Sequence, residues 1–366
     1  MAVVYHGTPV GIDDPTSSDP KILRLGWLNS KQTSYAVSEP EGALTYYPVN
    51  DEPTDKATYR IEVVVDKPYT AVSNGLLTSV TDEGARRRFV WEMRQPMASY
   101  LATLDIAPDY QLETARSASG IPVRTYTTPN TPLPEVRAFR QAPAMIDFLE
   151  PLLGPYPFAA FGNVVARDPK LYYSLETQTM VNYPEDAGID EVTVVHELAH
   201  QWFGDAVTVA EWRDLWLAEG FATYVEILWP NRASPAAFDA AMRDLYASIV
   251  KKQVGPAVVS RPEDIFADNT YDRGALTLYA LRLKVGDAAF YKILRTYYAT
   301  YRYRNATSAD FIDVATTVGN TSGVPELLHA WLYEEPVPPL PGAATVRAPS
   351  VASAKTVPPA HGVRRR

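Results

Sequence analysis

The chain contains no cysteine, which excludes a disulfide framework, thiolate metal ligands and a cysteine nucleophile. Histidine is also scarce, with five residues in a chain of 366. Any metal site must therefore combine histidine with carboxylate side chains. Two of the histidines, His196 and His200, lie four positions apart.

Basic residues are outnumbered by acidic ones, 34 to 43, and the net charge is −9. This balance argues against a nucleic-acid partner, because phosphate recognition needs clustered Lys and Arg. No apolar run approaches the ~20 residues that span a bilayer. The N-terminus lacks the basic start and apolar centre of a secretory signal. We therefore expect no membrane association and a cytoplasmic location, with an exported mature form left open.

The pattern of apolar residues changes along the chain. Residues 1–118 alternate apolar with polar side chains, and Asn74-Gly75 and Glu83-Gly84 are the expected hairpin tips. Residues 119–341 become mostly helical after Val192, with Thr307 or Ser308 as one helix cap. Residues 342–366 are rich in Pro and Ala and predict a disordered tail. The predicted fold class is α+β, with a β-rich N-terminal domain followed by a mostly helical domain.

The segment "HELAH" carries the candidate metal chemistry. Residues four apart on a helix project from one face, so His196 and His200 can both reach one ion about 2 Å away. A catalytic zinc needs a third protein ligand and one open position. Glu219, nineteen positions beyond His200, is the candidate. Glu197 lies beside His196 and can overhang the ion without binding it.

Taken with its surroundings, this motif resembles a known family. "HELAHQWFGD" followed by "DLWLAEGFATY" looks like the aminopeptidase N family of zinc metallopeptidases, of the gluzincin type with eighteen residues between the second histidine and the glutamate. The similarity extends from roughly Ser38 to Pro341 and includes "LGPYPF" and "TYDRGAL". It implies a thermolysin-like catalytic domain at 119–341.

The resemblance implies a role for each residue of the metal site. One Zn²⁺ ion would be held by His196, His200 and Glu219 and would lower the pKa of a bound water. Glu197 would act as the general base and then pass the proton to the departing amine. Tyr271 matches the family tyrosine that stabilises the oxyanion.

Selection of a free N-terminus requires a carboxylate that pairs with the α-ammonium. Glu176, in "YSLETQT", stands where the family has its amine-binding glutamate, and Glu39 matches the second amine anchor. The implied function is a zinc-dependent aminopeptidase acting on peptides with a free N-terminus. No pattern in the chain indicates an oligomeric state.

Three positions depart from the family pattern. Tyr173 and Thr177 replace a glycine and an asparagine around Glu176, and Ala218 stands where asparagine often precedes the zinc glutamate. The alternatives are a zinc endopeptidase, an epoxide hydrolase on the same fold, or a non-catalytic scaffold. Retention of the complete residue set argues against the scaffold, because such descendants tend to lose ligands.

Overall fold

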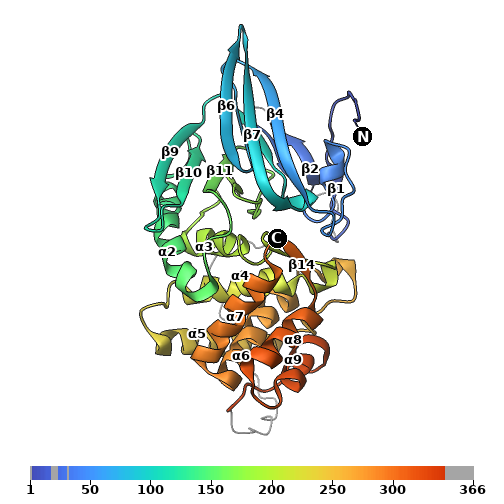
Figure 1. Ribbon diagram of the computed structural model, residues 1–366, viewed down its shortest axis with the longest axis vertical. Helices are drawn as coiled ribbons and strands as arrows, with labels where there is room; N and C mark the ends of the chain where they lie inside the picture. Colours follow the sequence, from blue (N-terminus) through green and yellow to red (C-terminus); the bar gives the residue numbers. More distant parts are fainter. Residues whose placement is uncertain (1, 18–23, 31–32, 343–366) are drawn as a thin grey trace.

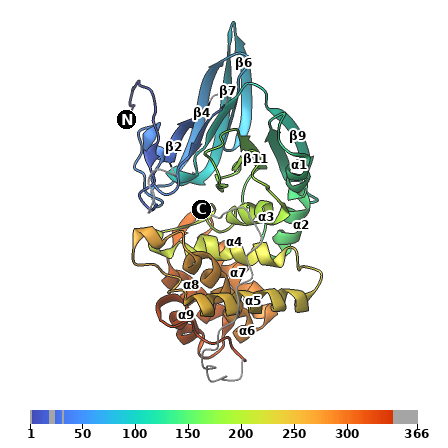
Figure 2. The ribbon, with the colours of Figure 1, turned by 180° about the vertical axis from the view of Figure 1, so that it is seen from behind.

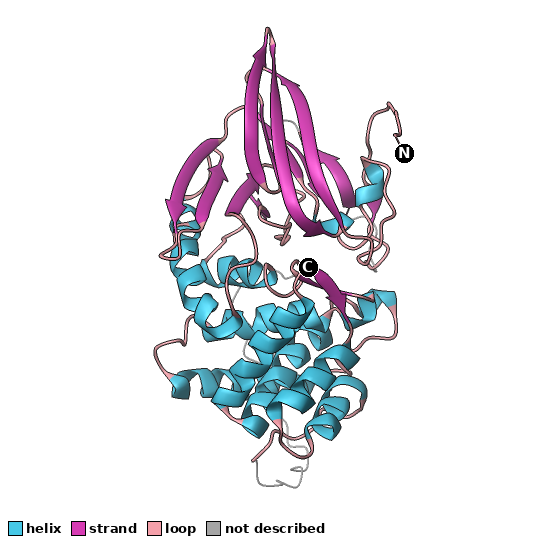
Figure 3. Cartoon of the chain, in the orientation of Figure 1, coloured by secondary structure: helices cyan, strands magenta, loops and turns pink. Residues whose placement is uncertain are grey.

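The computed structural model describes residues 2–17, 24–30 and 33–342. Most strands occupy the upper half of the molecule and most helices the lower half (Figures 1 and 3). This order confirms the predicted α+β class, a β-rich N-terminal part followed by a mostly helical part. The predicted tail at 342–366 lies outside the described residues apart from Gly342.

The N-terminal strands form two antiparallel sheets. The first has the order β1 (Ile12–Asp13), β2 (Arg24–Asn29), β3 (Ser34–Val37), β8 (Leu104–Ala107) and β5 (Thr70–Ser73). The second has the order β4 (Ala57–Asp66), β7 (Arg86–Met97) and β6 (Leu76–Glu83). Short 3₁₀ turns lie at Ala43–Thr45 and Ser99–Leu101.

Of the two expected hairpin tips, one is confirmed and one is wrong. Glu83-Gly84 joins the paired strands β6 and β7, and Gly84 has a φ of 66°. Asn74-Gly75 instead connects β5 to β6, which belong to different sheets. The Asn74 side chain bonds to Leu101 O and Gln178 O rather than closing a local turn, so distant contacts decide the path of the chain here.

A third sheet leads into the helical half. Its order is β12 (Val181–Pro184), β11 (Phe161–Ala166), β10 (Pro122–Thr127) and β9 (Gln111–Arg116). β9 pairs with β10 in antiparallel fashion, and the other pairs are parallel. The predicted domain division at 118/119 falls in the turn between β9 and β10 and stays a prediction.

The helical half begins beside this sheet. Its helices are α1 (Leu133–Phe139), α2 (Ala142–Leu153), α3 (Glu191–His200), α4 (Trp216–Leu228), α5 (Pro235–Lys252), α6 (Gly274–Val285), α7 (Asp287–Tyr301), α8 (Ser308–Gly319) and α9 (Val324–Tyr333). The short strands β13 (Val207–Val209) and β14 (Arg304–Ala306) pair in parallel, and single turns lie at Trp212–Asp214, Pro262–Asp264 and Asn269–Arg273.

Local sequence accounts for several helix ends. Gly154, with a φ of 115°, caps α2 where the chain must leave the helix. Thr307 caps α8, and with Asp310 it forms a reciprocal capping box, which confirms the predicted cap. Within the described residues, no helix is both long and apolar enough to cross a bilayer.

The core of the helical half is centred on α4 and α6. Every residue from Gly274 to Leu281 is buried, as is every residue from Trp216 to Val225. Helices that are apolar all round belong in an interior. α3 and α4 lie at the junction with the sheets, as both views of the ribbon show (Figures 1 and 2).

Polar contacts also join the two halves at this junction. Lys56, just before β4, is half-buried, and its ammonium donates to Asp205 O and Arg304 O, each at 3.1 Å. The Asn305 amide donates to Pro53 O at 2.8 Å. The N-terminal part therefore contacts the loop that directly follows α3.

Candidate active site

Helix α3 places two histidines on one buried face. Asp190 caps the helix by accepting a hydrogen bond from Thr193 N at 2.9 Å. Val194, Val195, Leu198 and Ala199 are fully buried and hold the helix against its neighbours. His196 and His200 are themselves 8% and 1% exposed, so their imidazoles face the interior of the site.

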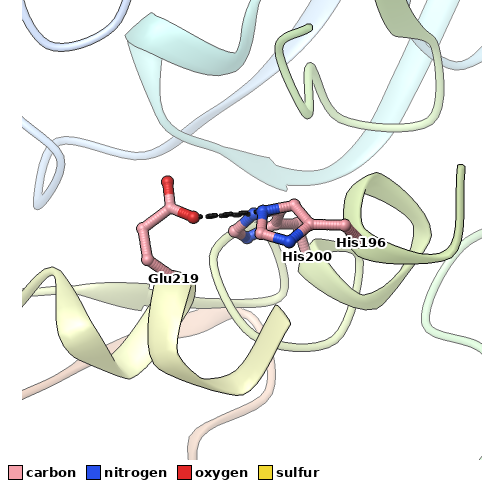
Figure 4. Close-up of side chains that lie close together, drawn as sticks. All are labelled: His196, His200 and Glu219. Atoms are coloured by element: carbon pink, nitrogen blue, oxygen red, sulfur yellow. Dashed lines mark hydrogen bonds and ion pairs between the residues drawn. The ribbon is translucent and has the colours of Figure 1, made fainter. Parts of the chain in front are cut away.

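Helix α4 brings Glu219 to these histidines (Figure 4). Glu219 Oε2 lies 3.2 Å from His196 Nε2 and 3.4 Å from His200 Nε2. The chain reaches α4 after turning at Gly204, where φ is 130°. A side chain at this position would crowd the imidazole, because a Cβ on Gly204 would lie 3.1 Å from His200 Nδ1.

These three side chains fit one tetrahedral cation. The edges of a tetrahedron with metal–ligand bonds of 2.0–2.1 Å are about 3.3 Å long. The two measured Nε2–Oε2 distances, 3.2 and 3.4 Å, bracket that value. Two imidazoles and one carboxylate also match the donor set of a catalytic zinc, which leaves one position open.

A second layer of contacts orients both imidazoles. His196 Nδ1 lies 2.9 Å from Glu226 Oε2, and His200 Nδ1 lies 3.2 Å from Phe203 O. Each contact directs Nε2 towards Glu219 and selects the tautomer that can bind a metal. Sequence reasoning missed Glu226. The available signal was its position seven residues after Glu219, two turns along the same face of α4.

Burial and neighbouring charges have opposite effects on the pKa values of the triad. Burial disfavours the His196 cation, but hydrogen bonds to Glu219 and Glu226 outweigh burial and raise its pKa to about 9. Burial favours the neutral form of Glu219, yet the two histidines outweigh it and lower the pKa of this carboxyl. The ionised carboxylate of Glu219 therefore lies beside two imidazoles in a buried pocket.

Glu197 and Glu176 lie next to this triad. Atoms of Glu176, Glu197 and His200 that could bind a metal are within 4.8 Å of one another. Burial raises the pKa of Glu197 to about 8, and burial also raises the pKa of Glu176. Glu176 Oε1 is buried and accepts no hydrogen bond from the part of the chain that the structure describes.

Glu39 reaches the same cluster from the N-terminal part. It follows β3 and is 1% exposed. Its carboxylate lies within 4.8 Å of those of Glu176 and Glu219. Three carboxylates from three distant segments therefore lie close together in the site.

Tyr271 closes the cluster from a wide, π-type turn at Asn269–Arg273. Its hydroxyl donates to Glu219 Oε1 at 3.1 Å, the oxygen that does not face the imidazoles. Arg273, in the same turn, is fully buried and donates to Trp331 O at 2.8 Å and Val254 O at 3.1 Å. These bonds anchor the turn to the end of α9 and to the segment after α5, and they fix the position of the phenol.

All seven residues singled out in the sequence therefore lie in one buried cluster. The three positions that depart from the family pattern, Tyr173, Thr177 and Ala218, are all buried. Tyr173 is 2% exposed and belongs to an apolar cluster with Leu25, Tyr35 and Leu171. Ala218 packs with Leu215, Val259 and Ile265 behind the α4 turn that carries Glu219.

Comparisons with known proteins agree with this geometry. Residues 161–331 match the peptidase family M1 domain, and residues 29–101 match the peptidase M1 N-terminal domain. Glutamyl aminopeptidase of Mus musculus is 28% identical over 353 residues, which cover 84% of this chain and 36% of that protein. Probable aminopeptidase 2 of Sulfurisphaera tokodaii is 28% identical over 335 residues, which cover 83% of this chain and 42% of that protein. The chain thus spans less than half the length of these relatives.

Solved structures cover more of the chain. The crystal structure of an M1 zinc metallopeptidase from Deinococcus radiodurans has a TM-score of 0.83 at 33% identity, covering 92% of this chain and 77% of that one. A mutant of the Deinococcus radiodurans enzyme bound to a Tyr-Ser-Ala substrate also has a TM-score of 0.83 at 33% identity, covering 92% and 76%. The sheets and helices of this chain are therefore arranged as in the Deinococcus radiodurans enzyme, in both the N-terminal and the helical part.

Proposed function

This chain belongs to peptidase family M1, and on that premise we propose that it is a zinc-dependent aminopeptidase that releases the N-terminal residue of peptides. The observation that carries the proposal is the convergence of His196 Nε2 and His200 Nε2 on Glu219 Oε2, at 3.2 and 3.4 Å. We assign one zinc ion to these three ligands.

Zinc, when bound, supplies Lewis-acid chemistry that makes water a nucleophile near neutral pH and polarises a carbonyl. Glu197 is the general base that takes the proton of the attacking water and delivers it to the departing amine. Its place on α3 directly after His196 supports this role, because the residue borders the metal ligands without being one of them.

Tyr271 is assigned to the developing oxyanion. A preorganised O–H donor stabilises negative charge that appears in the transition state and needs little reorganisation. The hydroxyl lies 3.1 Å from Oε1 of Glu219, one of the residues assigned to the metal. The bonds of Arg273 to Trp331 O and Ala330 O in α9 support a fixed position for this donor.

Glu176 and Glu39 are assigned to the substrate α-ammonium. Both are nearly fully buried, and Glu176 Oε1 is an acceptor that the described residues leave without a hydrogen bond. A buried carboxylate oxygen is stable when it meets a charged donor, and an ammonium supplies one. A peptide with a free N-terminus provides that group, whereas the interior of a chain does not.

The test is a panel of aminoacyl arylamides assayed after chelation and after zinc add-back. We expect turnover to disappear with the chelator and to return with one zinc per chain. Glu197→Gln is the matched variant, since it should keep the zinc and lower kcat about 10²- to 10⁴-fold.

Each rival function has its own outcome in the same assay. Equal cleavage of free and N-acetylated peptides would indicate an endopeptidase. Opening of an epoxide without arylamide turnover would indicate the hydrolase. Purified protein that binds no stoichiometric zinc would indicate a scaffold.

A further inference from the structure

We propose that Gln201 is a positioning residue that couples the metal helix α3 to residues 176–180 and thereby sets selectivity for a free N-terminal amine. The inference rests on the proposed function, because it concerns the carboxylate assigned to the substrate ammonium. Gln201 directly follows His200 and is 0% exposed.

The side chain of Gln201 bridges α3 and the Glu176 segment. Its Nε2 donates to Glu176 O at 3.3 Å, and its Oε1 accepts from Thr179 N at 2.8 Å. Oε1 also lies 3.3 Å from the Tyr156 hydroxyl. The partners fix the orientation of the amide, since a backbone N–H can only donate and a carbonyl can only accept.

The bridge holds a strained residue. Thr179 is β-branched, yet it has a φ of 66°, in the left-handed region that such residues rarely occupy. All its polar groups are engaged: its N–H bonds Gln201, its Oγ1 accepts from Gly75 N at 2.7 Å, and its carbonyl accepts from Arg124 at 3.2 Å. A strained backbone conformation persists only where many surrounding contacts hold it in place, and such residues cluster at functional sites.

The opposite side of the segment is fixed by the N-terminal part. Gln178 N donates to Leu101 O at 3.2 Å, and the Asn74 amide donates to Gln178 O at 2.7 Å. Hydrogen bonds therefore hold residues 176–180 to the N-terminal part on one side and to the end of α3 on the other. Loss of the Gln201 amide would keep the bonds to the N-terminal part and remove those to α3.

This arrangement separates amine binding from metal binding. The imidazoles of α3 are oriented by Glu226 and Phe203 O, and neither contact involves Gln201. Removal of the bridge should therefore shift the Glu176 carboxylate relative to the metal while the metal ligands stay in place. The expected effect is confined to ligands that carry an α-amine.

The experiment uses Gln201→Met, which keeps the length of the side chain and removes its polar atoms. The probes are L-leucine hydroxamate and its analogue without the amine, 4-methylpentanohydroxamate, titrated by calorimetry into the zinc-loaded full chain. Both ligands bind through the hydroxamate group and differ only in the α-amine. The ratio of their Kd values therefore measures the contribution of the amine to binding. We expect Kd for L-leucine hydroxamate to rise about tenfold, the size of one lost hydrogen bond, and Kd for the analogue to stay unchanged.

The matched control is Gln178→Met. Gln178 is equally buried and lies in the same segment, but its side chain contacts Pro96 O at 3.5 Å rather than α3. The Gln178→Met variant should therefore have a ratio of the two Kd values close to that of the wild type. Steady-state kinetics on leucyl arylamide should show a raised KM with a smaller change in kcat for Gln201→Met alone.

An equal rise of both Kd values, an unchanged ratio, or the same loss of ratio in Gln178→Met would overturn the proposal. If Gln201→Met does not fold, Gln201→Glu carries the same test, because it keeps the acceptor for Thr179 N and loses the donor to Glu176 O. The binding readout needs no turnover. A wild type that distinguishes the two hydroxamates but cleaves no arylamide would therefore refute the proposed function and leave this inference testable.

Discussion

Gly220 of α4 and Gly274 of α6 bring the backbones of their two helices into direct contact. A Cβ atom on Gly220 would lie 2.7 Å from the carbonyl carbon of Gly274 and 2.8 Å from its Cα. Gly220 follows Glu219, and Gly274 follows the turn that carries Tyr271. The helix contact therefore determines how closely the phenol approaches the carboxylate.

Gly220→Ala should force α4 and α6 apart, because the atoms that the new methyl meets are backbone atoms with little freedom to move. We expect a loss of about 1–3 kcal/mol in the free energy of unfolding, measured in urea, together with a lower kcat. Gly319→Ala in α8 is the control. Its Cβ would meet side-chain atoms at 3.4 Å, and its stability should stay within about 1 kcal/mol of the wild type.

Glu226→Gln should weaken zinc binding without removing a ligand. The carboxylate lies 2.9 Å from His196 Nδ1 and makes the imidazole a stronger donor towards the metal. We expect zinc affinity to fall about 10- to 100-fold in competition with a chromogenic chelator. Glu263→Gln, at an exposed turn, is the control and should bind zinc as the wild type does. Unchanged affinity in Glu226→Gln would show that the contact does not tune the metal.

A substrate with an N-terminal glutamate should react more slowly than one with glutamine. The carboxylates of Glu39, Glu176 and Glu219 lie within 4.8 Å of one another. The side chain of the N-terminal residue is only a few bonds from the bound ammonium. A substrate glutamate therefore holds its own carboxylate near these three carboxylates of the protein. We expect kcat/KM for glutamyl arylamide to be about 10- to 100-fold below that for glutaminyl arylamide. The two substrates have nearly the same shape, so equal rates would refute the electrostatic argument.

Asp105 should make stability depend on pH. Burial raises its pKa to about 7, although hydrogen bonds from Thr103 and Asn182 favour the charged form. Between pH of about 4 and 7 the folded chain holds a proton that the unfolded chain releases, so the free energy of unfolding falls by about 1.4 kcal/mol per pH unit as pH rises. Asp105→Asn should remove this contribution.

The measurement is urea unfolding of both proteins at several pH values from 5 to about 7. Asparagine can accept from Asn182 and donate to the Thr103 hydroxyl, which in turn bonds Ala36 O. The stability of Asp105→Asn relative to the wild type should therefore increase with pH. Asp66→Asn, exposed at the end of β4, should follow the wild-type slope. Parallel curves for Asp105→Asn and the wild type would contradict the assignment.

The metal triad could be predicted from the sequence because most of its geometry is local. The four-residue spacing of His196 and His200 places both on one helical face, and the family resemblance singled out Glu219. Glu226 was not predicted, because its partner His196 lies on another helix, although its spacing of seven residues from Glu219 placed both on one face of α4. The roles of Gln201 and Thr179 depend on long-range hydrogen bonds that no sequence pattern encodes.

The same distinction applies to the strands. Glu83-Gly84 closes a hairpin between neighbouring segments, and local turn chemistry was sufficient to predict it. At Asn74-Gly75 the flanking strands join different sheets, because contacts to Leu101 and Gln178 determine the path. The division at 118/119 depends on how whole sheets associate, and it remains a prediction.

The ammonium of Lys56 has a consequence for dissection of the molecule. It donates hydrogen bonds to the carbonyl oxygens of Asp205, just before β13, and of Arg304, the first residue of β14. Lys56 itself lies more than a hundred residues earlier in the chain than either acceptor. Helices produced without the preceding strands would lose the donor that bonds both carbonyls, one of which lies five residues beyond the second histidine. The helical half is thus not a portable module, and severing the two parts should cost catalysis even where every reacting group is retained.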